Sequence, residues 1–195
     1  MIQSLDELLP GDIILSRNGT WLSKAIRWVT SLQTGNAQYS HAAMAVGTGL
    51  DVEALWQISV LDVEKYEDQD IEVWRIPLDA DEQRCLSHNL LQMANEVYGA
   101  GKLFLFAADA VGTQLSKLWG NKTPSFWFME RFGMKDPIPV CSELDGFALQ
   151  KFTKHALKDE NDLVIPWQRF SPDYLEDVLK LPNNNAEMIY KQEFK

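Results

Sequence analysis

The stretch QYSHAAMAVGTGLDVEALW, residues 38–56, has small apolar side chains on either side of Gly47-Thr48-Gly49. This pattern predicts a β-hairpin with a three-residue loop, in which a glycine takes the left-handed position. That loop length pairs Val46 with Leu50 and decides which side chains share a face of the hairpin. The stretch therefore predicts an antiparallel strand pair, around which the rest of the fold is arranged.

Two polar side chains interrupt this apolar hairpin. His41 heads the first strand and Glu53 lies inside the second, and each costs free energy in a half-buried sheet unless it is paired. The register makes them diagonal neighbours on one face, about 7–8 Å apart between backbones and within reach of a long side chain. Ala43 and Ala45 on the same face leave room for another element. The opposite face is expected to be core: Met44, Val46, Val52, Ala54 and Trp56.

Cys141 supplies the expected partner of this pair. It begins a helix predicted over residues 141–157, with an apolar face that runs through Leu144 and Ala148. A helix docked on the sheet face of His41 would aim the sulfur at the imidazole. At a helix N-terminus the thiolate is stabilised by unpaired N–H groups and the macrodipole, and these groups can also bind an oxyanion. A thiolate beside a carboxylate-held imidazole is the arrangement for covalent acyl transfer.

Length and composition limit the remaining possibilities. At 195 residues and 46% hydrophobic content, the chain is expected to form one domain over 1–195. Acidic residues outnumber basic ones 28 to 18, and no basic arm or stripe is present, so nucleic acid is not an expected partner. Two cysteines and no CxxC predict neither a disulfide framework nor a zinc site. No metal or other cofactor is expected.

Localisation is inferred only from what the sequence lacks. The first residues show no basic segment followed by an apolar one, and no apolar run is long enough to cross a bilayer. A cytoplasmic location is the default expectation. Export by a route that needs no such signal stays open.

The rest of the chain predicts a mixed set of elements. Ser171 is expected to cap a short helix with Pro172 at its first position, and the polar tail after Pro182 is expected to fray. Residues 103–135 are predicted to form a helical, aromatic-rich insertion. Strands are predicted over 13–15, 58–63 and 71–76, and helices over 21–32 and 81–97.

The order of these motifs resembles the circularly permuted papain-like hydrolases of the NlpC superfamily, specifically the YiiX-like branch related to lecithin–retinol acyltransferases. The histidine strand precedes the cysteine helix, the reverse of ordinary papain order, and Glu53 stands twelve residues after His41. The segments that carry the resemblance are Gly11–Leu15, Ser40–Met44, Val52–Ala54, Tyr98, Cys141–Leu144 and Phe170–Leu175.

The resemblance implies an α+β, permuted papain-like fold, in which an antiparallel sheet packs against the helix that starts at the nucleophile. It implies Cys141 as the nucleophile, His41 as the base and Glu53 as the residue that orients the base. Tyr98 and Ser142 are implied as substrate-binding residues. Two features depart from the pattern: Asp145 stands where an apolar residue is expected, and a long aromatic stretch occupies 119–134.

Three functions agree with this sequence. The first is a cysteine amidase or peptidase that forms a thioester with small peptides such as cell-wall peptides. The second is a lipid acyl hydrolase or acyltransferase, for which residues 119–134 would form a lid or acyl-chain pocket rather than the core of an insertion. The third is a non-catalytic binding module, in which Cys141 is a buried hydrophobe, as a lone cysteine usually is. Cys85 lies mid-helix and is not a candidate nucleophile.

Overall fold

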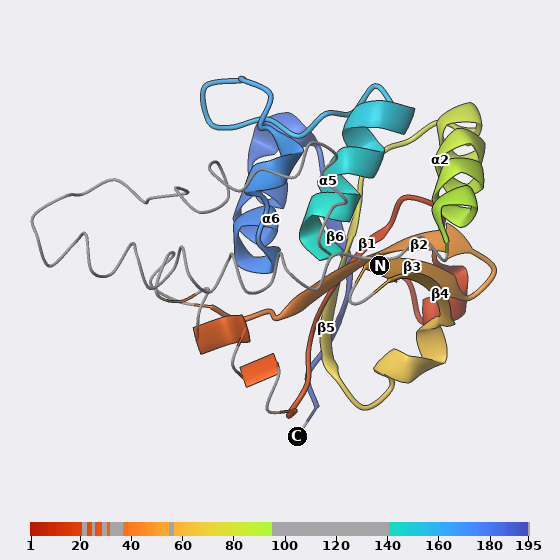
Figure 1. Ribbon diagram of the computed structural model, residues 1–195, viewed down its shortest axis with the longest axis vertical. Coiled ribbons are helices and arrows are strands. Elements are labelled where there is room, and N and C mark those ends of the chain that lie inside the picture. The colour runs from red at the N-terminus through yellow and green to blue at the C-terminus, as the bar shows by residue number, and fades with distance from the viewer. Residues whose placement is uncertain are drawn as a thin grey trace, which may run out of the picture.

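The computed structural model describes residues 1–20, 23–24, 26–28, 31, 37–54, 57–94 and 141–194. In these ranges six strands form one antiparallel sheet in the order β4-β3-β2-β1-β5-β6, with helices packed on it (Figure 1). The predicted α+β class is confirmed. The strands are β1 (Ile13–Arg17), β2 (His41–Gly47), β3 (Leu50–Ala54), β4 (Ile58–Asp62), β5 (Asp70–Arg75) and β6 (Glu187–Gln192). The α-helices are α2 (Ala80–Met93), α5 (Cys141–Phe152) and α6 (Pro172–Leu179), and the 3-10 helices are η1 (Leu5–Glu7), η2 (Val63–Tyr66), η3 (Trp167–Arg169) and η4 (Pro182–Asn184).

Each face of the sheet has its own apolar cluster. The helices α2, α5 and α6 lie over one face (Figure 1), where Leu144 of α5 packs in a cluster with Met44 of β2. The short helices η1 and η2 contribute to the other face, where Tyr66 packs in a cluster with Ala43. Strand β2 is therefore buried from both sides.

The sheet face on which α5 docks differs from the prediction. α5 packs on the side of β2 that carries Ala42 and Met44, whereas Ala43 faces the cluster that includes Tyr66. Ala42 and Ala43 are both fully buried, so both faces of β2 suit a packed layer, and η2 occupies the one expected to receive α5. His41 is the first residue of β2, and this terminal position lets it meet the start of α5 at the end of the strand.

The turn between β2 and β3 is tighter than predicted. Gly47 pairs with Leu50, so the prediction of a three-residue loop with Val46 opposite Leu50 is wrong. The two turn residues have φ values of 54° at Thr48 and 73° at Gly49, as a type I′ turn requires. Val46 forms a β-bulge beside Gly47, and this extra residue compensates for the shorter loop. The rest of the two strands keeps the predicted register.

The C-terminal region agrees with the prediction at its start and not at its end. Ser171 caps α6 and accepts a hydrogen bond from the N–H of Tyr174 at 3.3 Å, with Pro172 in the first turn, as predicted. The tail after Pro182 was predicted to fray, but it continues into β6, which pairs with β5 along the edge of the sheet. Ile189 is the buried residue that anchors this strand. An edge strand needs apolar side chains on only one face. The polar composition of β6 therefore did not indicate a strand in the sequence.

Several predictions fall on residues outside the described part. They are half of the residues of the helix predicted over 21–32, the predicted substrate-binding residue Tyr98, and the aromatic-rich insertion over 103–135. Among the described helices, none combines the length and the apolar character needed to span a membrane.

Gly146 is a point of close packing in α5. A Cβ atom there would lie 2.6 Å from Cε2 of Phe170 and 3.3 Å from Cβ of Trp167. We expect Gly146→Ala to lower the free energy of unfolding by about 1–3 kcal/mol, because the added methyl overpacks a dense region. Urea denaturation measures this effect. Gly19→Ala is the control, since nothing lies within 4 Å of its added methyl, and equal stability of both variants would contradict the expectation.

Candidate active site

His41 and Glu53 come from neighbouring strands and meet on one face of the sheet. The pairing of Met44 with Val52 places Glu53 diagonally across from His41. Nε2 of His41 lies 2.7 Å from Oε2 of Glu53, and the two side chains are only 16% and 14% exposed. The predicted contact between this histidine and this glutamate is confirmed.

Cys141 is the first residue of α5, as predicted. Its thiol interacts with the ring of His41 and with the backbone N–H groups of Ala42 and Ser142. Since Nε2 of His41 is bound to Glu53, Nδ1 is the ring nitrogen left for the sulfur. Nδ1 is buried and makes no hydrogen bond of normal geometry in the described structure. Such loose contacts are common in catalytic sites that hold no substrate.

The three side chains shift each other's protonation. Burial lowers the pKa of His41, but the interactions of the imidazolium with Cys141 and Glu53 outweigh burial and raise the pKa to about 10. Burial raises the pKa of the Cys141 thiol, and the interaction with His41 then brings it below its ordinary value. Burial likewise opposes ionisation of Glu53, but His41 and then Lys65 lower its pKa to about 2. The favoured state is a thiolate–imidazolium pair held by a carboxylate.

A second layer of contacts, which the sequence did not reveal, surrounds Glu53. Nζ of Lys65 lies 2.8 Å from Oε2 of Glu53 and 2.8 Å from Oδ2 of Asp51. The hydroxyl of Tyr66 donates to the same Asp51 oxygen at 2.8 Å. Asp51 is fully buried, and burial raises its pKa although Lys65 and Tyr66 oppose the shift. The available signal was strand alternation, which already put Asp51 on the face of His41.

Of the two residues predicted to bind substrate, the structure describes Ser142 but not Tyr98. Ser142 is buried, and its hydroxyl donates to the carbonyl oxygen of Phe170 at 2.9 Å, which fixes the start of α5. Only its backbone N–H acts on the thiol of Cys141. Substrate binding by Ser142 stays a prediction, and it would involve the backbone rather than the hydroxyl.

Asp145 lies one helical turn after Cys141 and is the departure noted in the sequence. Its side chain is fully buried, and neither carboxyl oxygen has a hydrogen-bond partner in the described structure. Burial and the nearby charge of Cys141 raise its pKa well above the ordinary range, against a smaller opposing effect of His41. Burial and the charge of Cys141 therefore both favour the protonated, neutral form of the Asp145 carboxyl.

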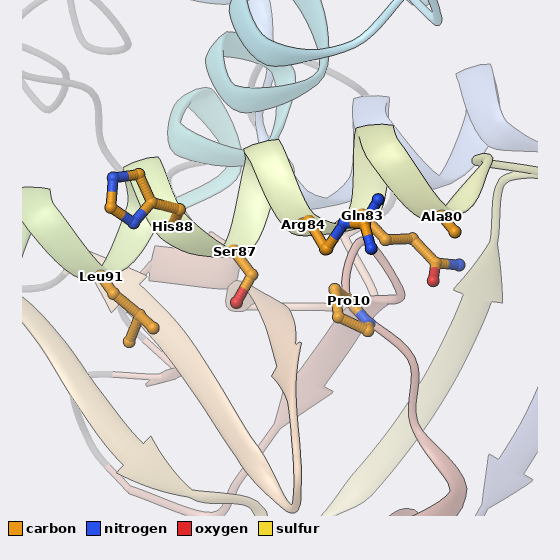
Figure 2. Close-up of a pocket in the computed structure, with 7 residues that line it drawn as sticks. All are labelled: Pro10, Ala80, Gln83, Arg84, Ser87, His88 and Leu91. Atoms are coloured by element: carbon orange, nitrogen blue, oxygen red, sulfur yellow. The ribbon is translucent and has the colours of Figure 1, made fainter.

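One hollow elsewhere in the described structure does not share this geometry. A hollow of about 410 Å³ lies between α2 and Pro10, and Figure 2 shows residues that line it, among them Ser87 and Leu91. The hydroxyl of Ser87 is already donated to the carbonyl oxygen of Val46 at 2.9 Å, and the lining includes no residue of the Cys141 site. In the described ranges, no group of three or more His, Cys, Asp or Glu side chains is placed to hold a metal ion.

The Cys141 site thus combines a thiol, an imidazole and a carboxylate in one partly enclosed place. A comparison of the chain with protein-family models and another with curated proteins each found no match. The function is therefore argued from the geometry of Cys141, His41 and Glu53.

Proposed function

We propose that this protein is a cysteine hydrolase with a permuted papain-like fold of the NlpC type. Cys141 is the nucleophile, His41 the general base and acid, and Glu53 the residue that orients His41. The observation that carries the proposal is the position of His41, with Glu53 at Nε2 and the Cys141 thiol acting on the same ring. The antiparallel sheet and the α-helix that begins at the cysteine support the proposed fold.

The first half of the reaction is acylation. The Cys141 thiolate attacks the carbonyl carbon of an amide, and the π electrons move to the oxygen. Backbone N–H groups at the start of α5 stabilise this oxyanion. As the oxyanion collapses, the C–N bond breaks, and the imidazolium of His41 gives its proton to the departing amine. A thioester on Cys141 remains.

The second half is hydrolysis of the thioester. Neutral His41 takes a proton from water, and the resulting hydroxide attacks the thioester carbon. The C–S bond then breaks, which releases the carboxylic acid and restores the thiolate–imidazolium pair. Glu53 stabilises the charged imidazole in both halves and keeps its ring plane fixed.

Small peptides, such as cell-wall peptides, are the proposed substrates. This choice rests on the resemblance of the motif order to amidases and peptidases of the permuted papain-like class. A lipid acyl hydrolase or acyltransferase would use the same thioester and differ in the acyl donor, and in an acyltransferase another acceptor would take the place of water. The test below therefore includes both kinds of donor.

The proposed activity predicts selective covalent labelling of Cys141. We expect a peptide acyloxymethyl ketone to label the intact protein once, with the label mapped by mass spectrometry to Cys141. Cys141→Ser should abolish this label, whereas Cys85→Ser, which removes the exposed thiol of α2, should leave it unchanged. A fatty-acyl chloromethyl ketone, applied at the same concentration, should react more slowly.

Two outcomes would count against parts of this proposal. Faster labelling by the fatty-acyl reagent, with rates that rise with chain length, would move the substrate class to lipids and keep the nucleophile. Absence of labelling by either reagent, or labelling that maps to Cys85, would remove the enzymatic reading and favour a binding module.

A further inference from the structure

We propose that Lys65 is a positioning residue of the catalytic site, which fixes the carboxylate of Glu53 and through it the ring of His41. This inference deepens the proposed function and rests on it. It extends the site from three side chains on β2, β3 and α5 to a connected network that includes η2.

The contacts of the Lys65 ammonium identify this role. Nζ lies 2.8 Å from Oε2 of Glu53, the same oxygen that lies 2.7 Å from Nε2 of His41. Nζ also lies 3.0 Å from Oδ1 and 2.8 Å from Oδ2 of Asp51. An ammonium has three protons to donate, so these three contacts use all of them. Lys65 therefore acts as a cationic clamp and not as a nucleophile.

The clamp is itself held in place. Asp51 is fully buried and is also bound by the hydroxyl of Tyr66, while Nζ of Lys65 lies 4.8 Å from the centre of the Tyr66 ring. The backbone of η2 is tied down on both sides, because Gln69 Nε2 donates to the carbonyl of Lys65 at 2.8 Å. The N–H of Val63 donates to the carbonyl of Gly49 at 2.9 Å.

A purely structural role for Lys65 would need only part of this geometry. Neutralising the buried charge of Asp51 requires contacts to Asp51 alone. Yet the ammonium also reaches the one oxygen of Glu53 that bonds to the imidazole. With two charge-assisted donors on Oε2, rotation of the carboxylate would break both bonds at once. Without Lys65, only His41 would hold that oxygen, and the ring would lose its fixed orientation.

The test compares three variants by the rate at which iodoacetamide alkylates Cys141 at pH 6 and by kcat and KM for a cleaved peptide. Lys65→Met keeps the aliphatic stem but removes the donors. We expect both the alkylation rate and kcat to fall about tenfold with KM unchanged, as for other residues that orient a functional side chain through a hydrogen bond. Lys65→Arg should restore most of the rate. Lys191→Met is the matched control, because it removes a lysine 3.0 Å from buried Glu72 on the β5–β6 side of the sheet.

Lys65→Met leaves Asp51 as an unpaired buried charge and can fail to fold for that reason. The double variant Asp51→Asn/Lys65→Met removes one negative and one positive charge together, so the net charge of the site is that of the wild type. It should still show the roughly tenfold fall, because Glu53 still lacks its second donor. A double variant that is folded and as fast as the wild type would overturn the inference.

The failure of this inference differs from the failure of the proposed function. If Cys141 of the wild type is inert to iodoacetamide at pH 6, there is no activated thiol and the proposed function fails. If the wild type reacts and the Lys65 variants react equally fast, the function stands and only the role of Lys65 is lost. A fall in Lys191→Met as large as that in Lys65→Met would show general destabilisation and would also overturn the role.

Discussion

His41→Ala is expected to slow the alkylation of Cys141 by iodoacetamide by about a hundredfold or more at pH 6. Burial raises the pKa of the Cys141 thiol, and the interaction with His41 is the largest effect that lowers it. Without the imidazolium, burial dominates, and a thiol with an ordinary pKa of about 8.5 is less than about 1% ionised at pH 6. Peptide hydrolysis should fall further, by about 10³-fold or more, because the general base is lost as well.

The wild type and His41→Ala should also differ in how the alkylation rate of Cys141 depends on pH. In the wild type the thiol pKa is lowered, so the alkylation rate should begin to fall at a lower pH than it does for a thiol without the imidazole. In His41→Ala the rate should rise about tenfold with each pH unit up to the pKa of the unassisted thiol. Iodoacetamide kinetics followed by mass spectrometry between pH 5 and pH 9 would measure both curves.

Cys85 is an internal reference in the same experiment. It is exposed and lies inside α2 rather than at a helix N-terminus, so its alkylation should follow the same pH curve in both proteins. Two thiols that react at equal rates in the folded wild type would refute the activation of Cys141. A His41→Ala profile identical to the wild-type profile would refute the role of His41.

Asp145→Asn is expected to make the protein more stable than the wild type at pH 8 and to change its stability little at pH 4. Burial raises the pKa of this carboxyl well above its ordinary value, so the folded protein holds a proton that the unfolded chain releases. Stability linked to Asp145 is therefore complete below the unfolded pKa and is lost as the pH rises toward the folded pKa. Asparagine avoids this loss because its amide has no proton to release.

The amide of the variant and the neutral acid of the wild type leave comparable polar groups without partners in the described structure. The free-energy costs of burying these two groups should therefore be nearly equal at low pH. At high pH the two proteins should differ only because the wild-type carboxyl must keep its proton to stay neutral. Urea denaturation at pH 4 and pH 8 measures both values. Asp68→Asn, at an exposed turn, is the control and should show no such pH dependence. A variant destabilised at pH 8 would mean that Asp145 is ionised and needed in that form.

Local sequence patterns predicted the parts of the site that depend on periodicity and on chain ends. Strand alternation put His41 and Glu53 on one face, and the observed bond of 2.7 Å agrees with it. The start of a helix at Cys141 and the cap at Ser171 were also predicted correctly. These features depend on neighbours within a few residues in the chain, which is why the sequence by itself determined them.

The choice of sheet face for α5 depended on tertiary structure. Ala42 and Ala43 are equally small and equally buried, so the pattern of β2 is compatible with a helix on either side. The face on which α5 packs depends on which other elements cover the sheet, and Tyr66 of η2 covers the face that carries Ala43. Periodicity cannot report such competition, because it describes one strand at a time.

The contacts of Lys65 and the burial of Asp145 were also decided only in three dimensions. Lys65 reaches Asp51 and Glu53 through a long, flexible side chain, and its reach depends on how η2 folds back on β3. Asp145 stands where the family pattern has an apolar residue, but this departure alone does not show that its carboxyl is enclosed without a hydrogen-bond partner. The sequence alone determined which residues the site needs and in what order they occur. Tertiary packing decided how each one is held and charged, because burial and ion pairing arise between segments far apart in the chain.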